Sequence, residues 1–459
     1  MRKTLALLLA AAFLYVVPPA PLSTKSQTLA ATSKFFTATN PIPNRYIVVL
    51  ATTDLSPIPD SQAPVSKTAT PVVVNNSVAS AFSLDASSTA FIASPMPADP
   101  VVIATATALT NEYGGTFSTT WSSALKGFRL HANNTQAIAM SNDSRVAFIV
   151  QDGAIAVGTP DGEPIVMGPD PGGLQNPQPN ASWGLDRINQ RYLPLDKWYE
   201  YHNDGEGVNA YVIDTGILPT HVEFGERAFA IYDAVDREGN GIDCNGHGSH
   251  VAGTIGGQTY GVAKKVRLFG VRVLNCQGIG AWSDVIDGVN FVTWHSRQPT
   301  QQGVPAVANM SLGGETNRAT DAAVRNSIRS GVVYVVAAGN GNKDASTYSP
   351  AGVPEAITVG ATTRGDARGE FSNYGPALDL FAPGVSITSA WIGDNQMYAT
   401  ASGTSMASPH VAGVVALYLE TRRTASPSTV RSALVGTSTS GVVSNIGETS
   451  PNRLLFTNY

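Results

Sequence analysis

Residues 402–413 read SGTSMASPHVAG, and this stretch runs directly into an apolar helical pattern. Ser405 lies at the start of the expected helix, among Gly, Ala and Ser residues. A serine before a helix is most often an N-cap. The alternative is a nucleophile whose small neighbours let a substrate backbone come close. The rest of the chain decides between these two interpretations.

The composition is that of a large folded protein with few charges. Of the 459 residues, 43% are hydrophobic and 14% are charged, and the net charge is −5. This length allows two folded units. No basic run indicates a nucleic-acid surface, so we expect no nucleic-acid partner. The 44 glycines, with many Ser, Thr and Ala residues, favour an extracellular enzyme.

The N-terminus has the pattern of a secretory signal peptide. Arg2 and Lys3 precede an apolar run over 5–17, and small residues follow. The run is short for a membrane span, and no other segment is long and apolar enough to cross a bilayer. We therefore expect a signal peptide at 1–22, a secreted protein, and a mature form that is not bound to a membrane.

A small α+β domain is expected at 40–157. Its elements alternate as strand, helix, strand, helix and strand. The stretch 51–100 is rich in Ser, Thr, Ala and Pro and is interpreted as a flexible insertion. The elements are expected at 45–50, 101–115, 124–132, 134–143 and 145–155.

Residues 158–182 are dense in Gly and Pro. Such a segment is not expected to sustain a helix or a central strand. We place an exposed linker with the maturation region at 158–180, because such segments are readily cut by proteases. Autocleavage is expected somewhere between about Gln151 and Asn180.

From residue 181 onward, near-continuous apolar strands alternate with helical patterns. This is typical of a parallel sheet with helices on both faces, so the expected fold class of 181–459 is α/β. Ligands of such sheets bind beyond the carboxyl ends of the strands. Strands are expected at 207–217, 267–274, 306–314, 331–340 and 356–362, and helices at 283–296 and 320–331.

Four polar residues fall at strand ends or helix starts, and each has a role in acyl transfer. Asp214 and Asn340 end strands, while His247 and Ser405 open helices. A serine needs a base to take its proton, and histidine titrates near neutrality. A buried carboxylate orients the imidazole, and the amide of Asn340 with the backbone N–H of Ser405 can hold an oxyanion. This set favours the nucleophile interpretation of Ser405.

The blocks VIDTGI (212–217), NGHGSHVAGT (245–254), AAGN (337–340) and SGTSMASPHVAG resemble the subtilisin-like serine protease family, peptidase S8. The proteinase K and aqualysin branch is the most similar, and the resemblance covers about 181–459. It implies a subtilisin-like fold and a secreted serine endopeptidase that acts on proteins and peptides. The implied triad is Asp214, His247 and Ser405, with Asn340 as oxyanion donor.

The resemblance also implies substrate-binding residues. Two strands would grip the substrate backbone, which implies broad specificity. A pocket would take the residue before the scissile bond, and one side chain would border a more distant subsite. The strands are Gly278-Ile279-Gly280 and Ser311-Leu312-Gly313, the pocket is Ala337, Ala338 and Gly339, and the side chain is Trp282, where the family often has a tyrosine.

The segment 40–157 resembles the inhibitory propeptide of the same family, a ferredoxin-like domain. This implies a precursor that is inhibited by its own propeptide and processes itself. The insertion at 51–100 departs from the usual compact domain. We expect the enzyme to be a monomer.

The chain has two cysteines, Cys244 and Cys276. In an exported chain a pair is more often bonded than free, although two free thiols are the alternative. The resemblance assigns them to an aqualysin-type bridge, just before the expected catalytic histidine and just before the expected edge strand.

The resemblance further implies structural calcium, which is not needed for catalysis and which oxygen ligands bind. One site would use Asp379 with the carbonyls of Pro354 and Ala356. A second would lie near four residues of one segment, although the family has Asp where Asn189 stands. Those four residues are Asp186, Asn189, Gln190 and Asp196.

Two classes of function stay open. The first is a secreted serine endopeptidase made as an inhibited precursor. The second is a binding protein with the same fold, held permanently by its prodomain. The complete set of four polar residues favours the enzyme. Neither an H-E-x-x-H zinc motif nor a G-x-S-x-G motif occurs, which argues against a zinc protease and an α/β-hydrolase.

Overall fold

The computed structural model describes residues 33–51, 96–158, 161, 164–167, 175–236 and 239–459. All of these except Ser33 belong to one compact unit, Lys34–Tyr459. The expected signal peptide and most of the expected insertion lie outside the described residues, as does part of the expected linker.

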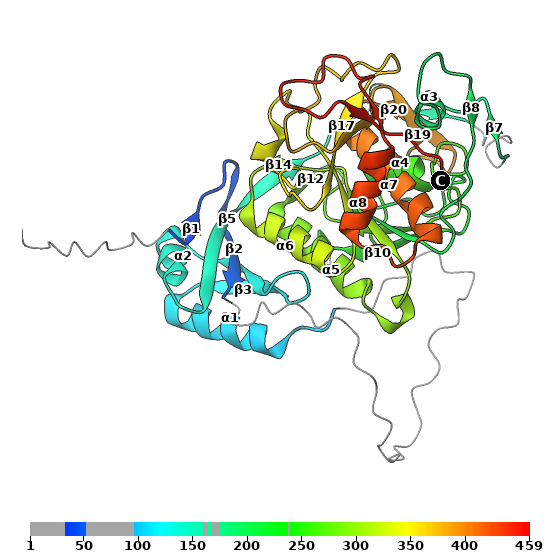
Figure 1. Ribbon diagram of the computed structural model, residues 1–459. Coiled ribbons are helices and arrows are strands. Elements are labelled where there is room, and N and C mark those ends of the chain that lie inside the picture. Colours follow the sequence, from blue (N-terminus) through cyan, green and yellow to red (C-terminus); the bar gives the residue numbers. More distant parts are fainter. Residues whose placement is uncertain (1–32, 52–95, 159–160, 162–163, 168–174, 237–238) are drawn as a thin grey trace, which may run out of the picture. The chain divides into compact units, whose positions relative to one another are not determined.

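The first part of this unit is a small sheet with two helices (Figure 1), in the strand order β1-β5-β2-β4-β3. The five expected elements are present, together with two strands that the sequence did not predict, β1 and β3. Both helices have strong N-caps: Asp99 accepts a hydrogen bond from the backbone of Val101, and Asn133 forms a capping box with Gln136. The elements are β1 (Phe35–Phe36), β2 (Pro41–Leu50), α1 (Pro100–Tyr113), β3 (Thr116–Trp121), β4 (Gly127–His131), α2 (Asn134–Ser141) and β5 (Val146–Ala156).

A larger sheet of nine strands follows, in the order β10-β11-β9-β13-β15-β17-β18-β22-β21. Every neighbouring pair is parallel except β21 and β22. The chain moves to one side of β9 first and returns to β13 on its other side, which makes a topological switch point. The strands are β9 (Asn209–Asp214), β10 (Ala228–Asp233), β11 (Arg267–Arg272), β13 (Ala306–Met310), β15 (Val333–Ala337), β17 (Ile357–Thr362), β18 (Leu380–Pro383), β21 (Thr439–Ser440) and β22 (Arg453–Leu454).

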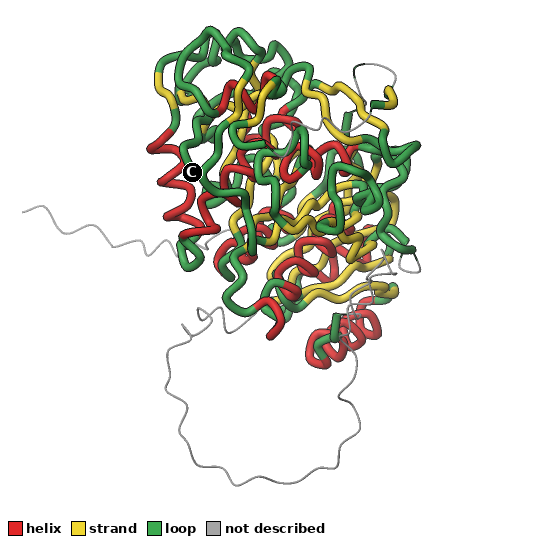
Figure 2. The backbone as a smooth tube through the Cα atoms, turned by 90° about the vertical axis from the view of Figure 1, so that its right-hand side faces the viewer, coloured by secondary structure: helices red, strands yellow, loops and turns green. Residues whose placement is uncertain are grey.

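Helices cover both faces of this sheet, as the sequence predicted (Figures 1 and 2). Alternate residues of β9 enter different cores: Val212 packs with the helices α4 and α7, whereas Tyr211 and Ile213 pack with α5 and α6. The fold is therefore α/β, with the carboxyl ends of the parallel strands at one edge. The helices are α4 (His247–Gly256), α5 (Trp282–His295), α6 (Arg318–Arg329), α7 (Thr404–Thr421) and α8 (Pro427–Thr437), with short 3₁₀ turns at Pro299–Gln301 and Ala345–Thr347.

Short strands form further small sheets around this core, and two of them lie within the expected linker at 158–180. That segment contains β6 (Ile165–Val166) and β7 (Gln178–Pro179). Each is two residues long and lies at a sheet edge, where proline is tolerated. The pairs are β6 with β20 (Met397–Ala401), β20 with β19 (Ile387–Ala390), β7 with β8 (Trp198–Tyr199), and β14 (Gly314–Glu315) with β16 (Tyr348–Ser349); α3 (Trp183–Ile188) precedes β8.

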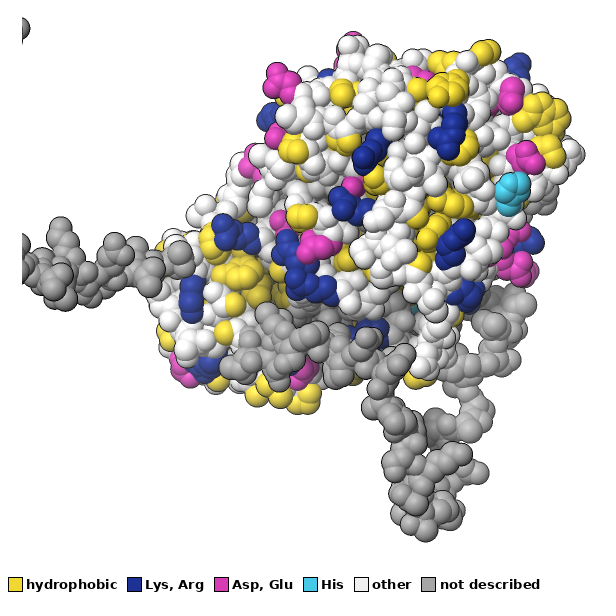
Figure 3. Space-filling view, in the orientation of Figure 1, with side chains coloured by type: hydrophobic (Ala, Val, Ile, Leu, Met, Phe, Trp, Pro, Cys, Tyr) yellow, Lys and Arg dark blue, Asp and Glu magenta, His cyan; other side chains and the backbone are white. Residues whose placement is uncertain are grey.

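The surface seen in Figure 3 carries basic side chains scattered among acidic and uncharged ones. In the described part of the chain, no helix combines the length and the apolar character that a membrane crossing requires.

Candidate active site

A carboxylate and an imidazole meet at the carboxyl end of β9. Asp214 is the last residue of β9, and His247 is the first residue of α4. Oδ1 of Asp214 lies 2.7 Å from Nδ1 of His247, and both side chains are buried. Because a carboxylate only accepts, Nδ1 carries the proton and Nε2 is the basic nitrogen. Within the described residues this Nε2 has no hydrogen-bond partner.

Electrostatics at this pair favour the protonated imidazole. Burial lowers the pKa of His247, but the charge of Asp214, its hydrogen bond and the charge of Asp243 together outweigh burial, so the pKa is raised. A general base works best when its pKa lies near the working pH. The pair is therefore built to accept a proton on Nε2.

The carboxylate of Asp243 holds the loop that leads into α4, and the sequence analysis did not single it out. Its Oδ1 accepts hydrogen bonds from Oγ1 of Thr215 and from the backbone N–H groups of Asn245 and Gly246, each at 2.9 Å. Its Oδ2 accepts from the backbone and the hydroxyl of Ser249, at 2.9 and 2.7 Å. An acidic residue just before a helix was the available signal.

Ser405 is the second residue of α7, and it too is buried. Its Oγ donates to the carbonyl oxygen of Ser311 at 3.0 Å, not to the unpartnered Nε2 of His247. Catalytic hydrogen bonds are often unformed in the absence of substrate. Ser405 and His247 thus lie at the starts of α7 and α4, two helices that share one core, and the Ser405 hydroxyl is bound to Ser311 rather than to His247.

Two N–H donors converge beside Ser405. Oδ1 of Asn340 accepts from the backbone and the hydroxyl of Thr404, both at 2.9 Å, which fixes the orientation of the amide. A Cβ placed on Gly403 would lie 3.3 Å from Nδ2 of Asn340 and 3.5 Å from the backbone N of Ser405. The absence of a side chain at Gly403 therefore leaves a small space bordered by both donors, and an oxyanion fits this chemistry.

The expected substrate-binding residues lie around these groups. Ile279 and Gly280 belong to β12 (Ile279–Ala281), whereas Gly278 precedes that strand with a φ of 71°, so the strand begins one residue later than expected. Ser311-Leu312-Gly313 forms the coil between β13 and β14. Ala337 ends β15, Ala338 and Gly339 follow it, and Trp282 opens α5.

The end of β5 lies along β12 as an antiparallel strand. The paired residues are Ala154 with Ala281, Ile155 with Gly280, and Ala156 with Ile279. The backbone N–H of Val157 then donates to the carbonyl of Gly278 at 3.0 Å. Asn245 and Val157 both border the position of a Cβ on Gly278, and Oδ1 of Asn245 accepts a hydrogen bond from the backbone of His247 at 3.2 Å. The chain after β5 therefore leads toward the N-terminus of α4.

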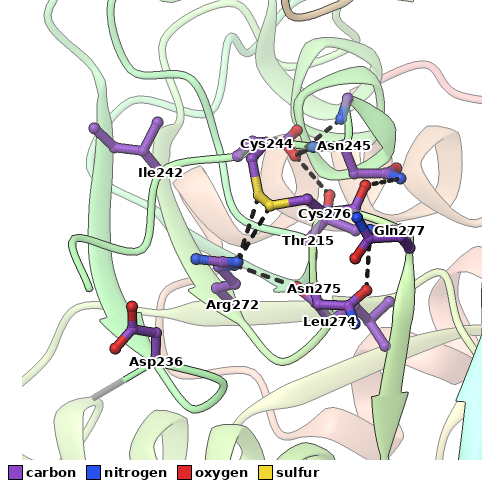
Figure 4. Close-up of a disulfide and its surroundings, with 12 residues drawn as sticks. Thr215, Asp236, Ile242, Cys244, Asn245, Arg272, Leu274, Asn275, Cys276 and Gln277 are labelled. Atoms are coloured by element: carbon purple, nitrogen blue, oxygen red, sulfur yellow. Dashed lines mark hydrogen bonds between the residues drawn. A yellow bond between two sulfur atoms is a disulfide. The ribbon is translucent and has the colours of Figure 1, made fainter. Parts of the chain in front are cut away.

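Cys244 and Cys276 form a disulfide, which confirms the expected bridge. It joins the loop before α4 to the loop before β12, and the guanidinium of Arg272 lies against both sulfur atoms (Figure 4). Asn245 strengthens the same junction, since its Nδ2 donates to the carbonyl of Cys276 at 3.1 Å. The two loops on which His247 and β12 depend are thus tied together.

The carboxylate of Asp379, an expected calcium ligand, is already paired with the guanidinium of Arg431. Its Oδ1 lies 2.5 Å from Nη2 of Arg431, and its Oδ2 accepts from the backbone N–H of Thr358 at 2.9 Å. In this arrangement Asp379 does not fit a calcium ion together with the carbonyls of Pro354 and Ala356. No group of three or more His, Cys, Asp or Glu side chains suited to a metal lies within the described ranges.

Residues 205–454 match the family model of the subtilases, peptidase S8. An extracellular serine proteinase of Thermus sp. (strain Rt41A) is 51% identical over 337 residues, which cover 73% of this chain and 77% of that protein. Alkaline serine exoprotease A of Vibrio alginolyticus is 49% identical over 333 residues, or 72% of this chain and 59% of that protein. A solved structure of a cold-adapted subtilisin-like serine proteinase matches with a TM-score of 0.58 and 52% identity, over 61% of this chain and 99% of that chain.

Proposed function

Because this chain belongs to the subtilase family and is a serine endopeptidase with a subtilisin-like fold, we propose that Ser405, His247 and Asp214 form its catalytic triad. Asn340 and the backbone N–H of Ser405 are the proposed oxyanion donors. One observation carries this assignment: the buried Asp214–His247 pair leaves Nε2 unpartnered, while Ser405 opens α7 beside the space at Gly403.

The proposed reaction proceeds in two halves. Oγ of Ser405 turns from Ser311, attacks the substrate carbonyl carbon and passes its proton to Nε2 of His247. Asp214 stabilises the imidazolium, and the two donors near Gly403 hold the oxyanion at the N-terminus of α7. His247 then protonates the leaving amine, which leaves an acyl-enzyme. A water molecule repeats the sequence and releases the acid.

Broad specificity is proposed because recognition uses the backbone. A strand paired with β12 is held by main-chain hydrogen bonds that every sequence offers. One subsite is proposed to select among side chains. Ile155 occupies it and packs beside Trp282. Both are buried, and both border the position of a Cβ on Gly314, at 3.5 and 3.0 Å. A branched aliphatic residue is the preferred occupant of this subsite.

The segment 40–157 is proposed to be the inhibitory propeptide, because the end of β5 occupies the edge of β12 that a substrate would use. Polar contacts support its docking. Asp152, fully buried, pairs with Arg45 at 2.5 Å and accepts from the backbone of Ser283 at 3.1 Å. Oδ1 of Asn290 accepts from three consecutive backbone N–H groups, residues 122–124.

Self-cleavage is proposed between Val157 and Asp161. Val157 is bound to Gly278 on one side, and Asp161 is bound on the other, where its N–H donates to the carbonyl of Thr400 at 2.9 Å. Four peptide bonds separate the two residues, a span of at most about 14 Å. The Gly158–Thr159 bond is preferred. Within the described part of the chain, nothing lies within 4 Å of a Cβ placed on Gly158, and the next two bonds involve the ring nitrogen and the carbonyl of Pro160.

Subtilases commonly bind calcium, and we propose that this chain binds it near Asp186. The carboxylate of Asp186 accepts from the backbone of Asp196 and Lys197, and Oε1 of Gln190 is buried with no partner among the described residues. An amide oxygen and a carboxylate from the same segment, Asp186 to Gln190, are the kind of oxygen ligands that suit this hard cation. An ion there would hold the segment around α3 and would take no part in the reaction.

The relatives named above include an extracellular proteinase. We therefore propose that this chain is secreted with the help of residues 1–22, and that it acts as a monomer on protein and peptide substrates.

The test is to express the wild type, Ser405→Ala and the control Ser428→Ala, an exposed serine of α8. Precursor processing and casein hydrolysis are followed in each. The proposal predicts processing and hydrolysis for the wild type and the control, and neither for Ser405→Ala. A wild type that stays full-length, or that is processed and still digests no casein, would favour the binding-protein alternative. N-terminal sequencing of the secreted form locates the cut, and a start within 190–459 contradicts the proposed maturation.

A further inference from the structure

One carboxylate of α5 is bound by the small sheet of the segment 40–157. Asp284 is the third residue of α5, and its side chain is 14% exposed. An acidic residue in the first turn of a helix is stabilised by the helix dipole, so the carboxylate suits this position. Asp284 belongs neither to the proposed triad nor to the proposed oxyanion donors. Its ion pairs are with two arginines of the small sheet.

The two arginines reach Asp284 from neighbouring strands. Arg129 of β4 faces Ile47 of β2, so Arg129, Ile47 and Arg45 share one face of the sheet. Ile47 packs in the same core as the apolar side chains of α5, which shows that this face is the docked one. Nη2 of Arg129 donates to Oδ1 of Asp284, and Nη2 of Arg45 lies 3.5 Å from Oδ2. Each carboxylate oxygen therefore faces a different guanidinium.

The charges of the small sheet and of α5 are complementary. Asp152 of β5, fully buried, pairs with Nε of Arg45 at 2.5 Å. The sheet therefore contributes two positive charges and one negative charge, and Asp284 contributes the second negative charge. His131 adds no third positive charge near neutral pH, because burial and the two arginines lower its pKa. Without Asp284, two guanidinium groups would share one carboxylate in a largely buried cluster.

We propose that Asp284 is the anchor for the guanidinium groups of Arg45 and Arg129, and that this anchor sets how long the cut propeptide stays on the enzyme. The inference rests on the proposed function. A cut after Gly158 breaks the chain beyond β5 and leaves the cluster on β2, β4 and α5 intact. A desolvated charge pair across an interface acts mainly on dissociation. The arginines must therefore leave Asp284 before the cleft becomes free.

The first test uses the full-length precursor with Asp284→Asn, Asp284→Glu and the control Glu226→Gln, at an exposed carboxylate. Asparagine keeps the shape and removes the charge, whereas glutamate keeps the charge. The cut is followed by gel and free enzyme by hydrolysis of a small peptide, so the delay between the two measures release. We expect a delay at least about tenfold shorter in Asp284→Asn, because one partner of a buried charge pair is lost. The other two variants should release the propeptide at close to the wild-type rate.

The second test asks whether Arg129 acts through Asp284. Arg129→Gln lies in the propeptide, so the processed enzyme is identical to the wild type and a shorter delay must come from the complex. The double variant Arg129→Gln/Asp284→Asn should shorten the delay by less than the product of the two single effects. Effects that multiply would mean that the two residues act independently, and the anchor would be wrong. If Asp284→Asn gives no folded precursor, an unchanged delay in Arg129→Gln overturns the anchor by itself.

The outcomes separate this inference from the proposed function. A wild type that is never cut would overturn both. A wild type that is cut, with the same delay as Asp284→Asn, would overturn the anchor and leave the triad and the propeptide as proposed. The processed Asp284→Asn enzyme, freed of propeptide, should have the kcat and KM of the wild type. A change in either constant would place the effect in the cleft and contradict the inference.

Discussion

The hydroxyl of Ser405 donates to the carbonyl oxygen of Ser311 at 3.0 Å, and the hydroxyl of Ser311 donates back to the carbonyl oxygen of Ser405 at 2.7 Å. These reciprocal bonds tie the start of α7 to the coil after β13. Under the proposed function, the first bond must break before His247 can take the proton. A substrate N–H that binds the Ser311 carbonyl would compete for that acceptor and release the nucleophile.

The pH dependence of hydrolysis should report the raised pKa of His247. Only the neutral imidazole can accept the serine proton, so activity should fall as pH drops through this pKa, which lies above the usual value of about 6.5. Asp214→Asn removes the charge that raises the pKa, so its acid limb should move to lower pH. Its rate should also fall by about 10⁴, the loss seen for this change in a serine protease of another fold. Profiles of kcat/KM against pH for a small peptide substrate check both effects.

Gly403→Ala should reduce kcat much more than it reduces stability. The new Cβ would lie 3.3 Å from Nδ2 of Asn340 and 3.5 Å from the backbone N of Ser405, where the oxyanion is proposed to bind. We expect a loss of about 10²-fold in kcat, comparable to losing one oxyanion donor. The control is Gly436→Ala on α8, whose Cβ would meet nothing within 4 Å. Equal kcat values for the two variants would contradict the assignment of this space.

Asp243→Asn should change both stability and the pH profile. An amide nitrogen at Oδ2 cannot accept from the backbone and hydroxyl of Ser249, so we expect a loss of about 2–3 kcal/mol in the free energy of unfolding. The negative charge of Asp243 is one cause of the raised pKa of His247, so the acid limb should shift to lower pH. Glu226→Gln, at an exposed carboxylate, is the control. An unchanged acid limb would limit Asp243 to a structural role.

The sequence predicted the central strands and the helices that flank them, because these carry long apolar runs with a clear period. It missed β10, β18, β21 and β22 of the same sheet, and also the short strands β6, β19 and β20 around it. β6 is the clearest case, since Ile165 pairs with Tyr398, more than two hundred residues away. A two-residue strand in a Gly- and Pro-rich segment has no local signal, because its stability comes from the edge that it covers.

The residues of the candidate site were easier to predict than the contacts that hold them in place. The four polar residues were visible because each lies at or just beyond the end of a strand or at the start of a helix, and the motif blocks indicated their chemistry. The contacts of Asp243 could not be read from the sequence, since they join a loop to Thr215 and to a helix. The pairing of Asp379 with Arg431 was invisible for the same reason. Neither Asp243 nor Asp379 belongs to a sequence repeat whose period would indicate its partner.

Removal of the Cys244–Cys276 bridge should loosen the substrate edge as well as the fold. The bridge closes a loop of 32 residues, which corresponds to about 3–4 kcal/mol of stability on the chain-entropy model. The double variant Cys244→Ser/Cys276→Ser should have a lower melting temperature and a higher KM for peptides, because β12 and the loop before α4 lose their link. Wild-type enzyme treated with a reductant should reproduce the change. An altered kcat with an unchanged KM would contradict the link to substrate binding.

The pair between Arg431 and Asp379 predicts how stability will respond to calcium. The Asp379 side chain is 5% exposed, and burial raises its pKa, while Arg431 supplies the opposing positive charge and a hydrogen bond. Arg431→Ala removes the hydrogen-bonded counter-charge of a buried carboxylate and leaves it with only the weaker field of Arg453. We expect a loss of about 1–2 kcal/mol, less than for a fully buried pair because the Arg431 side chain is 41% exposed.

The same variant exposes the carboxylate to another cation. With the guanidinium gone, the Asp379 carboxylate can offer oxygen ligands, so millimolar calcium should restore part of the lost melting temperature. Calcium should not restore the melting temperature of the double variant Arg431→Ala/Asp379→Asn. This result distinguishes an ion bound at Asp379 from the calcium proposed near Asp186. A wild type whose melting temperature falls on chelation, together with an Asp186→Asn variant that no longer responds, would assign the ion to Asp186. Loss of the wild-type response in Asp379→Asn instead would show that calcium displaces Arg431.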